Sequence, residues 1–366
     1  MVTSDFFPLQ GHKLVNAVYI TSRYRGAGPI NGSGVKPDPD GPGEWNYLIA
    51  YVGYQAAPGQ PMTVLHRVCL DWGSFVRTSG WHGLDAATDA GTTFGIGKSM
   101  RSAEGKGDTG RRILFAWMSN GYWDGHAPNY EPEGLEIYAP GLPKDSLSLP
   151  RDMTFAADGR LLQRFVPELE RLRIAETYEQ LPLTALHDGS LVWLKTAGRQ
   201  LEIFARFEVA GNCSFGLHVL ASKPSLTEFT TIGVDITDDL TFVDRLNSSG
   251  ANPLVPNRGL LDVRAGLLPP DHSSGSNSPE GAAAEGNGNR TRTIEIHVIV
   301  DGPIVTFIVS NETALSVYVY PQLQSSDGVA LWSSAGTGAA GAGATVRASA
   351  DVWQLRSVFN STTERE

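Results

Sequence analysis

Carboxylates and tryptophans are concentrated in the first third of the chain, and together they have the chemistry of a sugar site. Aromatic faces stack on the apolar faces of sugar rings, carboxylates accept hydrogen bonds from hydroxyls, and two carboxylates acting together can break a glycosidic bond. In an all-β protein, however, tryptophan commonly belongs to the core and aspartate to a turn, so both interpretations stay open. The residues are Trp45, Trp72, Trp81, Trp117, Trp123, Asp5, Asp71, Asp85, Asp89 and Asp124.

Other catalytic and cofactor motifs are missing from the sequence. There is no Gly-x-Ser-x-Gly elbow and no His-Glu-x-x-His, and the stretch TTFGIGKSM (92–100) lacks the first glycine of a phosphate loop. The two cysteines, Cys69 and Cys213, have no second cysteine or spaced histidine nearby, which excludes a zinc site and favours two buried free thiols over a disulfide. We therefore expect no cofactor and no metal.

The composition narrows the class of partner. With 366 residues, 41% of them hydrophobic, the chain can form two domains with separate cores. Only 19% of residues are charged and the net charge is -10, so a nucleic acid or an anionic membrane is not expected as a partner. No apolar run is long enough to span a bilayer, and the first residues lack the pattern of a signal peptide.

Six Asn-x-Ser/Thr sequons point to export of the intact protein. Each lies in a polar, turn-like setting where a glycan would find space. We expect an extracellular protein that is glycosylated at these positions. They are Asn31, Asn212, Asn247, Asn289, Asn311 and Asn360.

Short β-rich runs predict an all-β fold. Examples are NYLIAYVGY (46–54), RRILFAWM (111–118) and LEIFARFEV (201–209), and 41 glycines and 22 prolines separate such runs. The one helical pattern is VPELERLR (166–173), with proline and acidic residues early and basic residues late. Since it is too short for more than about two turns, we interpret it as part of a connector between two β-rich halves.

The C-terminal half has the alternation of a two-sided sheet. In TIEIHVIVD (293–301) the isoleucines and valines at even positions share one face, and DGP (301–303) makes a tight connection into IVTFIVSN (304–311). About eight such strands across 189–358 suit a β-sandwich. The predicted organisation is therefore a first domain over 1–160, a connector with a short helix over 161–188, and a sandwich over 189–358.

A series of strings in fixed order resembles glycoside hydrolase family 32, the β-fructofuranosidases that include invertases and inulinases. SDFFPL (4–9) is similar to the segment that follows the acid/base Glu of that family. The strings that follow it in the family's order are LDWGSF (70–75), TTFGIGKSM (92–100), GRRILFAWM (110–118), SLPRDMTFAADGRLLQRFVPELERLR (148–173), LEIFARFEV (201–209), TFVDRLNSSG (241–250), IEIHVIVDGPIVTFIVSNETALSVYVYP (294–321) and VWQLRS (352–357).

The resemblance implies a five-bladed β-propeller followed by a β-sandwich, with residues 1–160 forming only the C-terminal part of the propeller. It also implies a retaining mechanism, in which an Asp attacks a fructosyl unit and a Glu acts as acid and base. The family's Trp-x-Asn-Asp-Pro-Asn and Arg-Asp-Pro motifs, which carry the nucleophile and a stabilising Asp, do not occur in this sequence, and Val2 falls at the acid/base position. No catalytic residue is assigned.

Three residues are candidates for substrate contact under this resemblance. Asp71 matches the Asp of an Asp-x-Gly segment near the family's site, Trp72 is its neighbour, and Asp5 matches the Asp that follows the acid/base Glu. A turn-forming role for Asp71 remains an equal alternative. The expected ligand is sucrose or a β-fructan oligosaccharide.

Two functions remain open for this chain. The first is an inactive, N-terminally truncated fragment of a β-fructofuranosidase-like hydrolase. The second is a non-catalytic protein of the same fold that binds a carbohydrate or another partner. The missing carboxylates favour the absence of hydrolysis in both cases.

Overall fold

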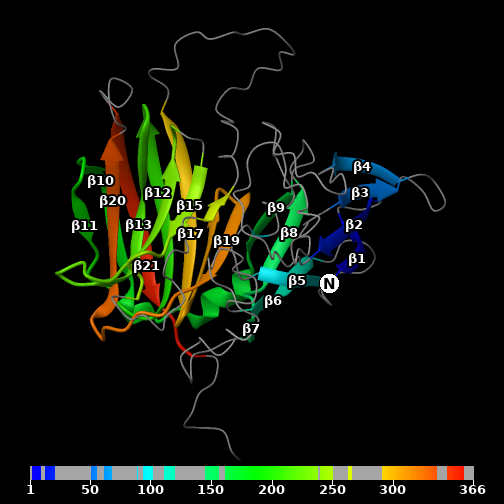
Figure 1. The fold of residues 1–366 in the computed structure, drawn as a ribbon, viewed down its shortest axis with the longest axis horizontal. Coiled ribbons are helices and arrows are strands. Elements are labelled where there is room, and N and C mark those ends of the chain that lie inside the picture. The colour runs from blue at the N-terminus through cyan, green and yellow to red at the C-terminus, as the bar shows by residue number, and fades with distance from the viewer. Residues whose placement is uncertain are drawn as a thin grey trace, which may run out of the picture. The chain divides into compact units, whose positions relative to one another are not determined.

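The computed structural model describes residues 2–9, 13–20, 51–55, 62–67, 89, 94–101, 111–119, 145–155, 161–237, 240–249, 263–265, 291–335 and 344–357. Within these ranges the regular structure is almost entirely β-strand, and the helices are two short 3₁₀ segments (Figure 1). The prediction of an all-β protein is confirmed. The chain divides into two compact units.

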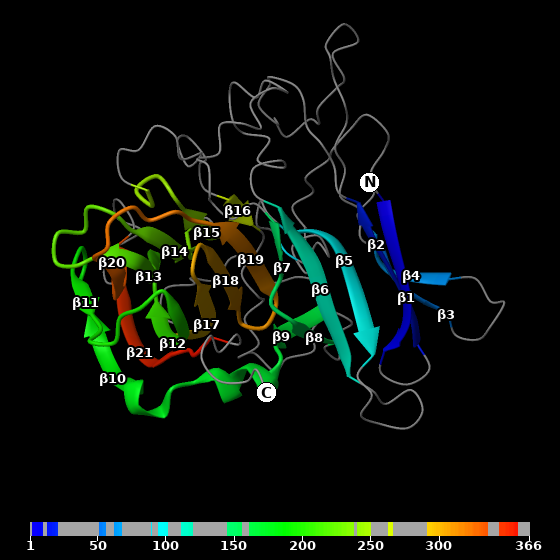
Figure 2. The ribbon, with the colours of Figure 1, turned by 90° about the horizontal axis from the view of Figure 1, so that it is seen from below.

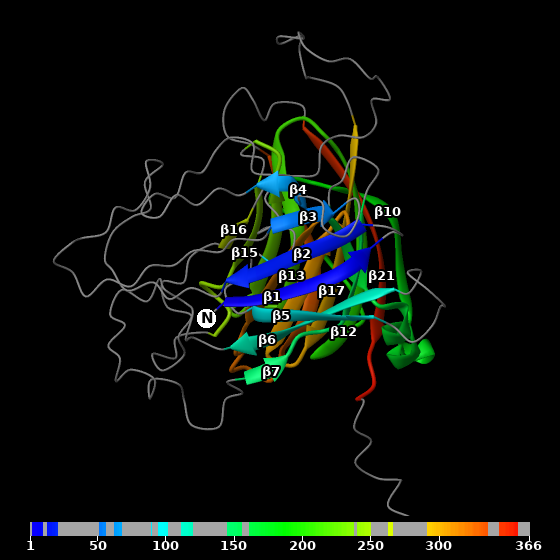
Figure 3. The same ribbon diagram turned by 90° about the vertical axis from the view of Figure 1, so that its right-hand side faces the viewer.

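The first unit comprises Met1–Val166, Ala251–Gly266 and Asn311–Tyr318. It contains two antiparallel hairpins, β1–β2 and β3–β4, and strands β2 and β3 lie next to each other (Figure 3). A five-stranded sheet follows, in the order β5-β6-β8-β9 with β7 paired to β6. The strands are β1 (Val2–Leu9), β2 (Lys13–Ile20), β3 (Tyr51–Gln55), β4 (Met62–Arg67), β5 (Phe94–Arg101), β6 (Arg112–Ser119), β7 (Asp145–Leu147), β8 (Arg151–Phe155) and β9 (Leu161–Phe165).

Strand β6 shows how the sequence makes this sheet. Leu114, Ala116 and Met118 are buried on one face, and the residues between them are half-buried. The neighbouring strand β5 contains the GIGKS stretch, with Lys98 opposite Phe115 of β6. A phosphate loop needs a turn between a strand and a helix, so the prediction that this stretch is no phosphate loop is confirmed.

Two six-stranded sheets contain all the remaining described strands. The first has the order β10 (Glu179–Leu186), β21 (Thr345–Gln354), β12 (Gln200–Ala210), β17 (Arg292–Asp301), β18 (Ile304–Val309) and β19 (Thr313–Tyr318). The second has the order β11 (Leu191–Trp193), β20 (Ser326–Ala335), β13 (Cys213–Ser222), β14 (Thr230–Asp235), β15 (Leu240–Asp244) and β16 (Val263–Ala265).

The second unit comprises Pro167–Gly250, Leu267–Ser310 and Val319–Glu366, and its strands form two layers (Figure 2). Its core lies between them. On β12, Leu201, Ile203, Ala205 and Phe207 are fully buried because alternate residues point inward. The Phe207 ring meets Phe215 of β13 with centroids 4.8 Å apart, which joins the two layers.

The β17–β18 hairpin agrees with its sequence pattern. Ile294, Ile296 and Val298 are buried on the inward face, as the alternation predicts. Asp301 pairs with Ile304, so the chain reverses through two residues. Gly302 takes φ +60°, a left-handed value that glycine adopts without strain.

The predicted helix is present but is of the tighter 3₁₀ type. It spans Pro167–Leu172, and a second 3₁₀ segment spans Ala175–Thr177. Neither segment buries a residue, so no apolar face extends them into an α-helix. Instead the chain is fixed by backbone contacts, including Ile174 N–H to the Gln354 carbonyl at 2.8 Å.

The contact between the two layers can be tested with Phe207→Ala. Removing this ring leaves a cavity between the sheets and should lower the free energy of unfolding by about 3–5 kcal/mol. Phe204→Ala on the same strand is the matched control, because Phe204 is half-buried on the opposite face. Urea unfolding followed by tryptophan fluorescence measures both, and equal losses would contradict the assignment of Phe207 to the core.

Candidate functional site

The residues predicted to contact substrate are only partly covered by the structure. Asp71 and Trp72 lie outside the described residues. Asp5 lies on β1 with its backbone opposite Ala17 of β2, and Val2 begins the same strand opposite Ile20. Their side chains are outside the description, so the predicted roles of Asp71, Trp72 and Asp5 stay predictions.

The remaining tryptophans and aspartates of the first third divide in the same way. Trp117 is half-buried on β6, and Asp89 is buried with 6% of its surface exposed. The half-buried Trp117 leaves both interpretations open, and Asp89 belongs to an ion pair, which neither interpretation predicts. The others fall outside the described ranges; they are Trp45, Trp81, Trp123, Asp85 and Asp124.

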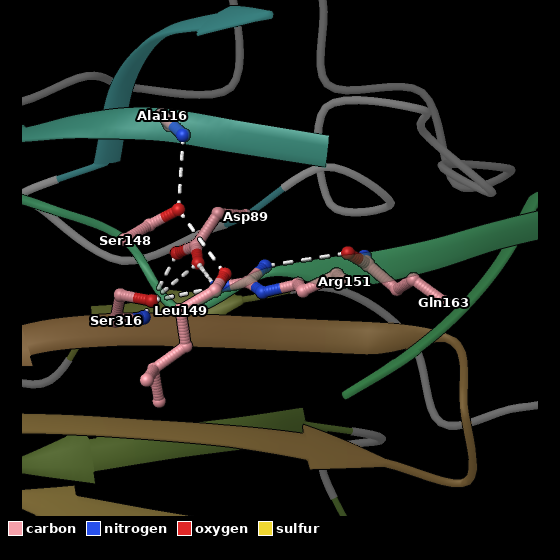
Figure 4. Close-up of polar contacts among 7 residues, drawn as sticks. All are labelled: Asp89, Ala116, Ser148, Leu149, Arg151, Gln163 and Ser316. Carbon is pink, nitrogen blue, oxygen red and sulfur yellow. Dashed lines mark hydrogen bonds and ion pairs between the residues drawn. The ribbon is translucent and has the colours of Figure 1, made fainter. Parts of the chain in front are cut away.

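Asp89 belongs to a buried ion pair in the first unit (Figure 4). Its Oδ2 accepts a hydrogen bond from Nη2 of Arg151 on β8 at 2.6 Å, and both side chains have 0% exposure. Ser316 on β19 adds to the pair: its Oγ accepts from the same Arg151 nitrogen at 2.7 Å and donates to Asp89 Oδ2 at 2.6 Å. The Ser316 backbone N–H binds Asp89 Oδ1 at 2.8 Å.

Two further polar residues lie near the Asp89–Arg151 pair (Figure 4). Gln163 on β9 accepts from Nη1 of Arg151 at 3.3 Å. Ser148, just before β8, accepts from the Ala116 N–H at 2.9 Å and so fixes the entry to this strand (Figure 4). The cluster brings together residues far apart in sequence, but opposite charges at this distance neutralise each other. Its arrangement suits a structural role rather than proton transfer.

Sequence reasoning did not find the role of Arg151. The string SLPRDM marks Arg151 as a charge at the start of an apolar strand, and a buried charge in a strand requires an anionic partner. That signal predicts a partner but not its identity, because Asp89 is 62 positions away.

A second ion pair involves Asp152, the next residue of β8. Arg111 binds the Asp152 carboxylate with two nitrogens, through Nε at 2.9 Å and Nη2 at 2.9 Å. Asp152 is 3% exposed, and the more exposed Arg164 lies 3.8 Å from it. Arg112 on β6 donates from Nε to Ser99 Oγ of β5 at 2.7 Å. These contacts involve residues of four strands of the sheet, β5, β6, β8 and β9.

The second unit has its own buried carboxylate, Glu202 on β12. Arg173 of the connector binds both of its oxygens at 2.7 and 2.8 Å, and His297 of β17 donates from Nε2 at 2.8 Å. Burial alone would raise the pKa of this carboxyl, but the two hydrogen-bonding partners outweigh burial and lower the pKa to about 2. Glu202 is therefore ionised at neutral pH.

An aromatic stack continues from this carboxylate. The Arg173 guanidinium lies 4.2 Å from the centre of a Trp353 ring, and Tyr178 stacks on Trp353 at 5.0 Å. The Tyr178 hydroxyl donates to Asp351 at 2.6 Å, which raises the pKa of the phenol. These contacts hold the connector against the outer face of β12 and β21.

Glu228 is the fourth buried carboxylate and binds backbone donors. It accepts from the N–H groups of Gln322 and Leu323 and from the Ser326 hydroxyl, the last at 2.6 Å. On the other side, the Ser222 hydroxyl accepts from the N–H of Glu228 at 2.9 Å. The carboxylate thus ties the loop after β13 to the loop before β20.

Aromatic rings gather around His218 on β13. The imidazole stacks with Trp332 at 5.7 Å and meets Phe229 edge-on at 4.8 Å, and Nδ1 lies 3.1 Å from the Thr231 hydroxyl. Burial lowers the pKa of His218 to about 4, so the ring is neutral at pH 7. Phe242 lies over Gly233, where a Cβ would meet its ring at 2.2 Å.

The described residues hold no group of three His, Cys, Asp or Glu side chains placed to bind a metal ion. Among them, no helix has the length and apolar character needed to cross a membrane. Cys213 is a buried free thiol, and burial raises its pKa to about 11; Cys69 lies outside the description. Of the sequons, Asn212, Asn247 and Asn311 are described, and Asn31, Asn289 and Asn360 are not.

The described part of the chain therefore has its buried carboxylates already engaged. Asp89, Asp152, Glu202 and Glu228 each bind a cation, a hydroxyl or a backbone N–H group. None of these four forms a pair of the kind that cleaves a glycosidic bond, where one carboxylic acid and one carboxylate flank the substrate.

The sequence over residues 168–354 matches the model of the C-terminal domain of glycosyl hydrolases family 32, and this match covers slightly more than half of the 366 residues. The chain belongs to this family, as the motif resemblance predicts. A comparison with curated proteins finds no significant match.

Solved structures share the fold across nearly the whole chain. Exo-inulinase from Aspergillus awamori is 16% identical with a TM-score of 0.58, over 98% of this chain and 56% of that one. Fructosyltransferase from A. japonicus is 13% identical with a TM-score of 0.61, over 98% and 57%. Fructan 1-exohydrolase IIa from Cichorium intybus is 15% identical with a TM-score of 0.59, over 96% and 61%. The chain thus spans little more than half the length of these proteins.

The ion pair in the first unit can be tested with Asp89→Asn. The change removes the anion and leaves the fully buried Arg151 charge without compensation, so the unfolding free energy should fall by about 3–5 kcal/mol. Arg164→Gln is the matched control in the same sheet; as a surface change beside Asp152 it should cost less than about 1 kcal/mol. Denaturant unfolding measures the free energy of unfolding of both variants. A loss for Asp89→Asn as small as that for Arg164→Gln would contradict the prediction that the buried pair stabilises the fold.

The buried histidine predicts a pH dependence of stability. The pKa of His218 is about 4 in the folded chain and about 6.5 in the unfolded chain. Between these two pH values the imidazole is therefore protonated in the unfolded chain and neutral in the folded chain. Stability should therefore fall by about 3 kcal/mol as the pH decreases from about 6.5 to about 4.

The variant His218→Gln removes this titration. Its unfolding free energy, measured against pH, should decrease less than that of the unchanged chain between these values. His187→Gln alters an exposed histidine and should leave the profile unchanged. Parallel profiles for His218→Gln and the unchanged chain would contradict the prediction.

Proposed function

We propose that this chain is part of a β-fructofuranosidase-type glycosidase, which hydrolyses sucrose or a β-fructan by the retaining two-carboxylate mechanism. In this proposal the first unit is the C-terminal part of a five-bladed β-propeller and the second is the β-sandwich that follows it. The observation that carries the proposal is the family match over residues 168–354.

The structural likeness supports the same substrate class. The proteins of similar fold are by name an exo-inulinase, a fructosyltransferase and a fructan exohydrolase. All three names refer to fructosyl units. The proposed partner is therefore sucrose or a β-fructan oligosaccharide, with Asp71, Trp72 and Asp5 as the contact residues taken from the motif resemblance.

The residues of this chain do not supply the proposed chemistry by themselves. A retaining glycosidase needs a nucleophilic carboxylate and an acid/base carboxyl about 5–5.5 Å apart. The sequence has neither the Trp-x-Asn-Asp-Pro-Asn motif nor the Arg-Asp-Pro motif. Val2, at the position of the acid/base Glu in the motif resemblance, has no ionisable group and cannot act as a general acid. We therefore propose that the 366-residue chain alone does not hydrolyse these sugars.

A second function is favoured by the state of the buried carboxylates. Asp89, Asp152 and Glu202 are engaged in ion pairs, which supports a structural role for these three residues. The alternative is therefore a carbohydrate-binding or interaction protein built on the family fold.

Activity assays test the first part of the proposal. The chain, incubated with sucrose, inulin and levan, should release no fructose above a buffer blank, while a complete exo-inulinase in the same buffer serves as the positive control. Hydrolysis with retention of anomeric configuration would overturn the proposal that the chain alone is inactive.

Calorimetric titration of the full chain with sucrose and with fructan oligosaccharides tests whether it retains a sugar site. If the chain retains a sugar site, Asp71→Asn should weaken binding about 10-fold, since a hydrogen bond to a charged group is worth about 1.5–3 kcal/mol. Asp85→Asn is the matched control, an aspartate to which the resemblance gives no role. Tight binding that Asp71→Asn leaves unchanged would contradict the proposed site.

A further inference from the structure

The three described sequons all lie in turns at the ends of strands. Asn212 lies between β12 and β13, Asn247 follows β15, and Asn311 lies between β18 and β19. Most of the described residues are in strands, so sequons placed without regard to structure would also fall within strands. At the end of a strand an added sugar meets fewer side chains of neighbouring strands than it would within the sheet.

Exposure distinguishes the three positions. Asn247 and Asn311 are exposed, whereas Asn212 is half-buried. A glycan attached to an exposed side chain extends into solvent and leaves the packing beneath it intact. The folded structure therefore accommodates a glycan best at Asn247 and Asn311.

Within the described residues, the side chain of Asn247 makes no hydrogen bond that would stabilise its turn. Turn residues of this type usually bond to the backbone two residues later, as Asp244 does with the Leu246 N–H and Asp235 with the Thr237 N–H, both at 2.8 Å. Within the described residues the Asn247 amide makes no such bond. The usual structural reason for an asparagine in a turn is therefore missing here.

The backbone around Asn247 is nevertheless well anchored. Its carbonyl accepts from the Phe229 N–H at 2.9 Å, and the adjacent Ser248 is buried with its hydroxyl 2.8 Å from that of Thr230. Leu246, which precedes the sequon, is 48% exposed. The turn therefore leaves Asn247 exposed, and the residue before it is an exposed leucine.

Asn311 is presented in a different way. It takes φ +62°, a left-handed value that asparagine tolerates better than most residues, so its backbone gives one reason for its presence. Its carbonyl accepts from the Gln163 N–H at 2.8 Å. The backbone is fixed and the exposed side chain remains available.

We infer that Asn247 and Asn311 are N-glycosylation sites. In the transfer, the Asn amide nitrogen forms a bond to C1 of the first sugar of a lipid-pyrophosphate-linked oligosaccharide. The bond between C1 and the phosphate oxygen breaks, the lipid pyrophosphate leaves, and the amide nitrogen loses one proton. The inference does not depend on the proposed glycosidase activity, and it places the protein on the export route of a cell that supplies this donor.

The test is expression of the full chain behind a cleavable signal peptide in yeast. A C-terminal tag with its own sequon reports that the chain has entered the compartment where transfer occurs. Peptide mapping, after an amidase converts each glycosylated Asn to Asp in heavy-oxygen water, should label Asn247 and Asn311. Both secreted and retained protein are mapped, so poor export does not hide the result.

Single variants identify the sites independently. Asn247→Gln and Asn311→Gln should each remove one glycan from the intact mass, and Asn247→Asp should do the same with a different side chain. Ser249→Thr keeps the sequon and should keep the glycan at Asn247. Chains that carry the tag glycan but have unmodified Asn247 and Asn311 would overturn the inference.

Discussion

The alternation of side chains along β12 is the constraint on which the second unit depends. Its inward residues, from Leu201 to Val209, form the core with the opposite sheet, and its outward residues remain on the other face. Glu202 is one of these outward residues, yet it is only 1% exposed because the connector lies over it. One strand thus determines both the packing of the layers and the place where the connector attaches.

Buried charge in this protein serves the structure. Asp89 neutralises Arg151 in the first unit, and Glu202 is held ionised by Arg173 and His297 in the second. Catalytic carboxylates need the opposite arrangement, in which one group keeps a proton and the other keeps a free lone pair. The described carboxylates therefore help to explain how this chain is stabilised.

Much of the fold follows from local sequence. The period-two pattern of TIEIHVIVD predicts which side chains are buried, and DGP predicts the reversal after Asp301, because both depend on neighbouring residues. The 3₁₀ form of the connector was not predicted, and the contacts that hold the connector in place, to Gln354 and Glu202, come from residues later in the chain. The partner of Arg151 was missed for the same reason. Pairs of this kind depend on topology, which a single sequence pattern does not contain.

The position of Glu228 has a consequence for anyone who exchanges loops among proteins of this fold. Its carboxylate accepts hydrogen bonds from the backbone N–H groups of residues 322 and 323, in the loop before β20. Glu228 itself lies in the loop after β13. A graft that replaced only one of these loops would bring in a backbone that is not shaped to this acceptor, or would leave two donors without it. The two loops form a single transferable unit, and a chimera should carry both or neither.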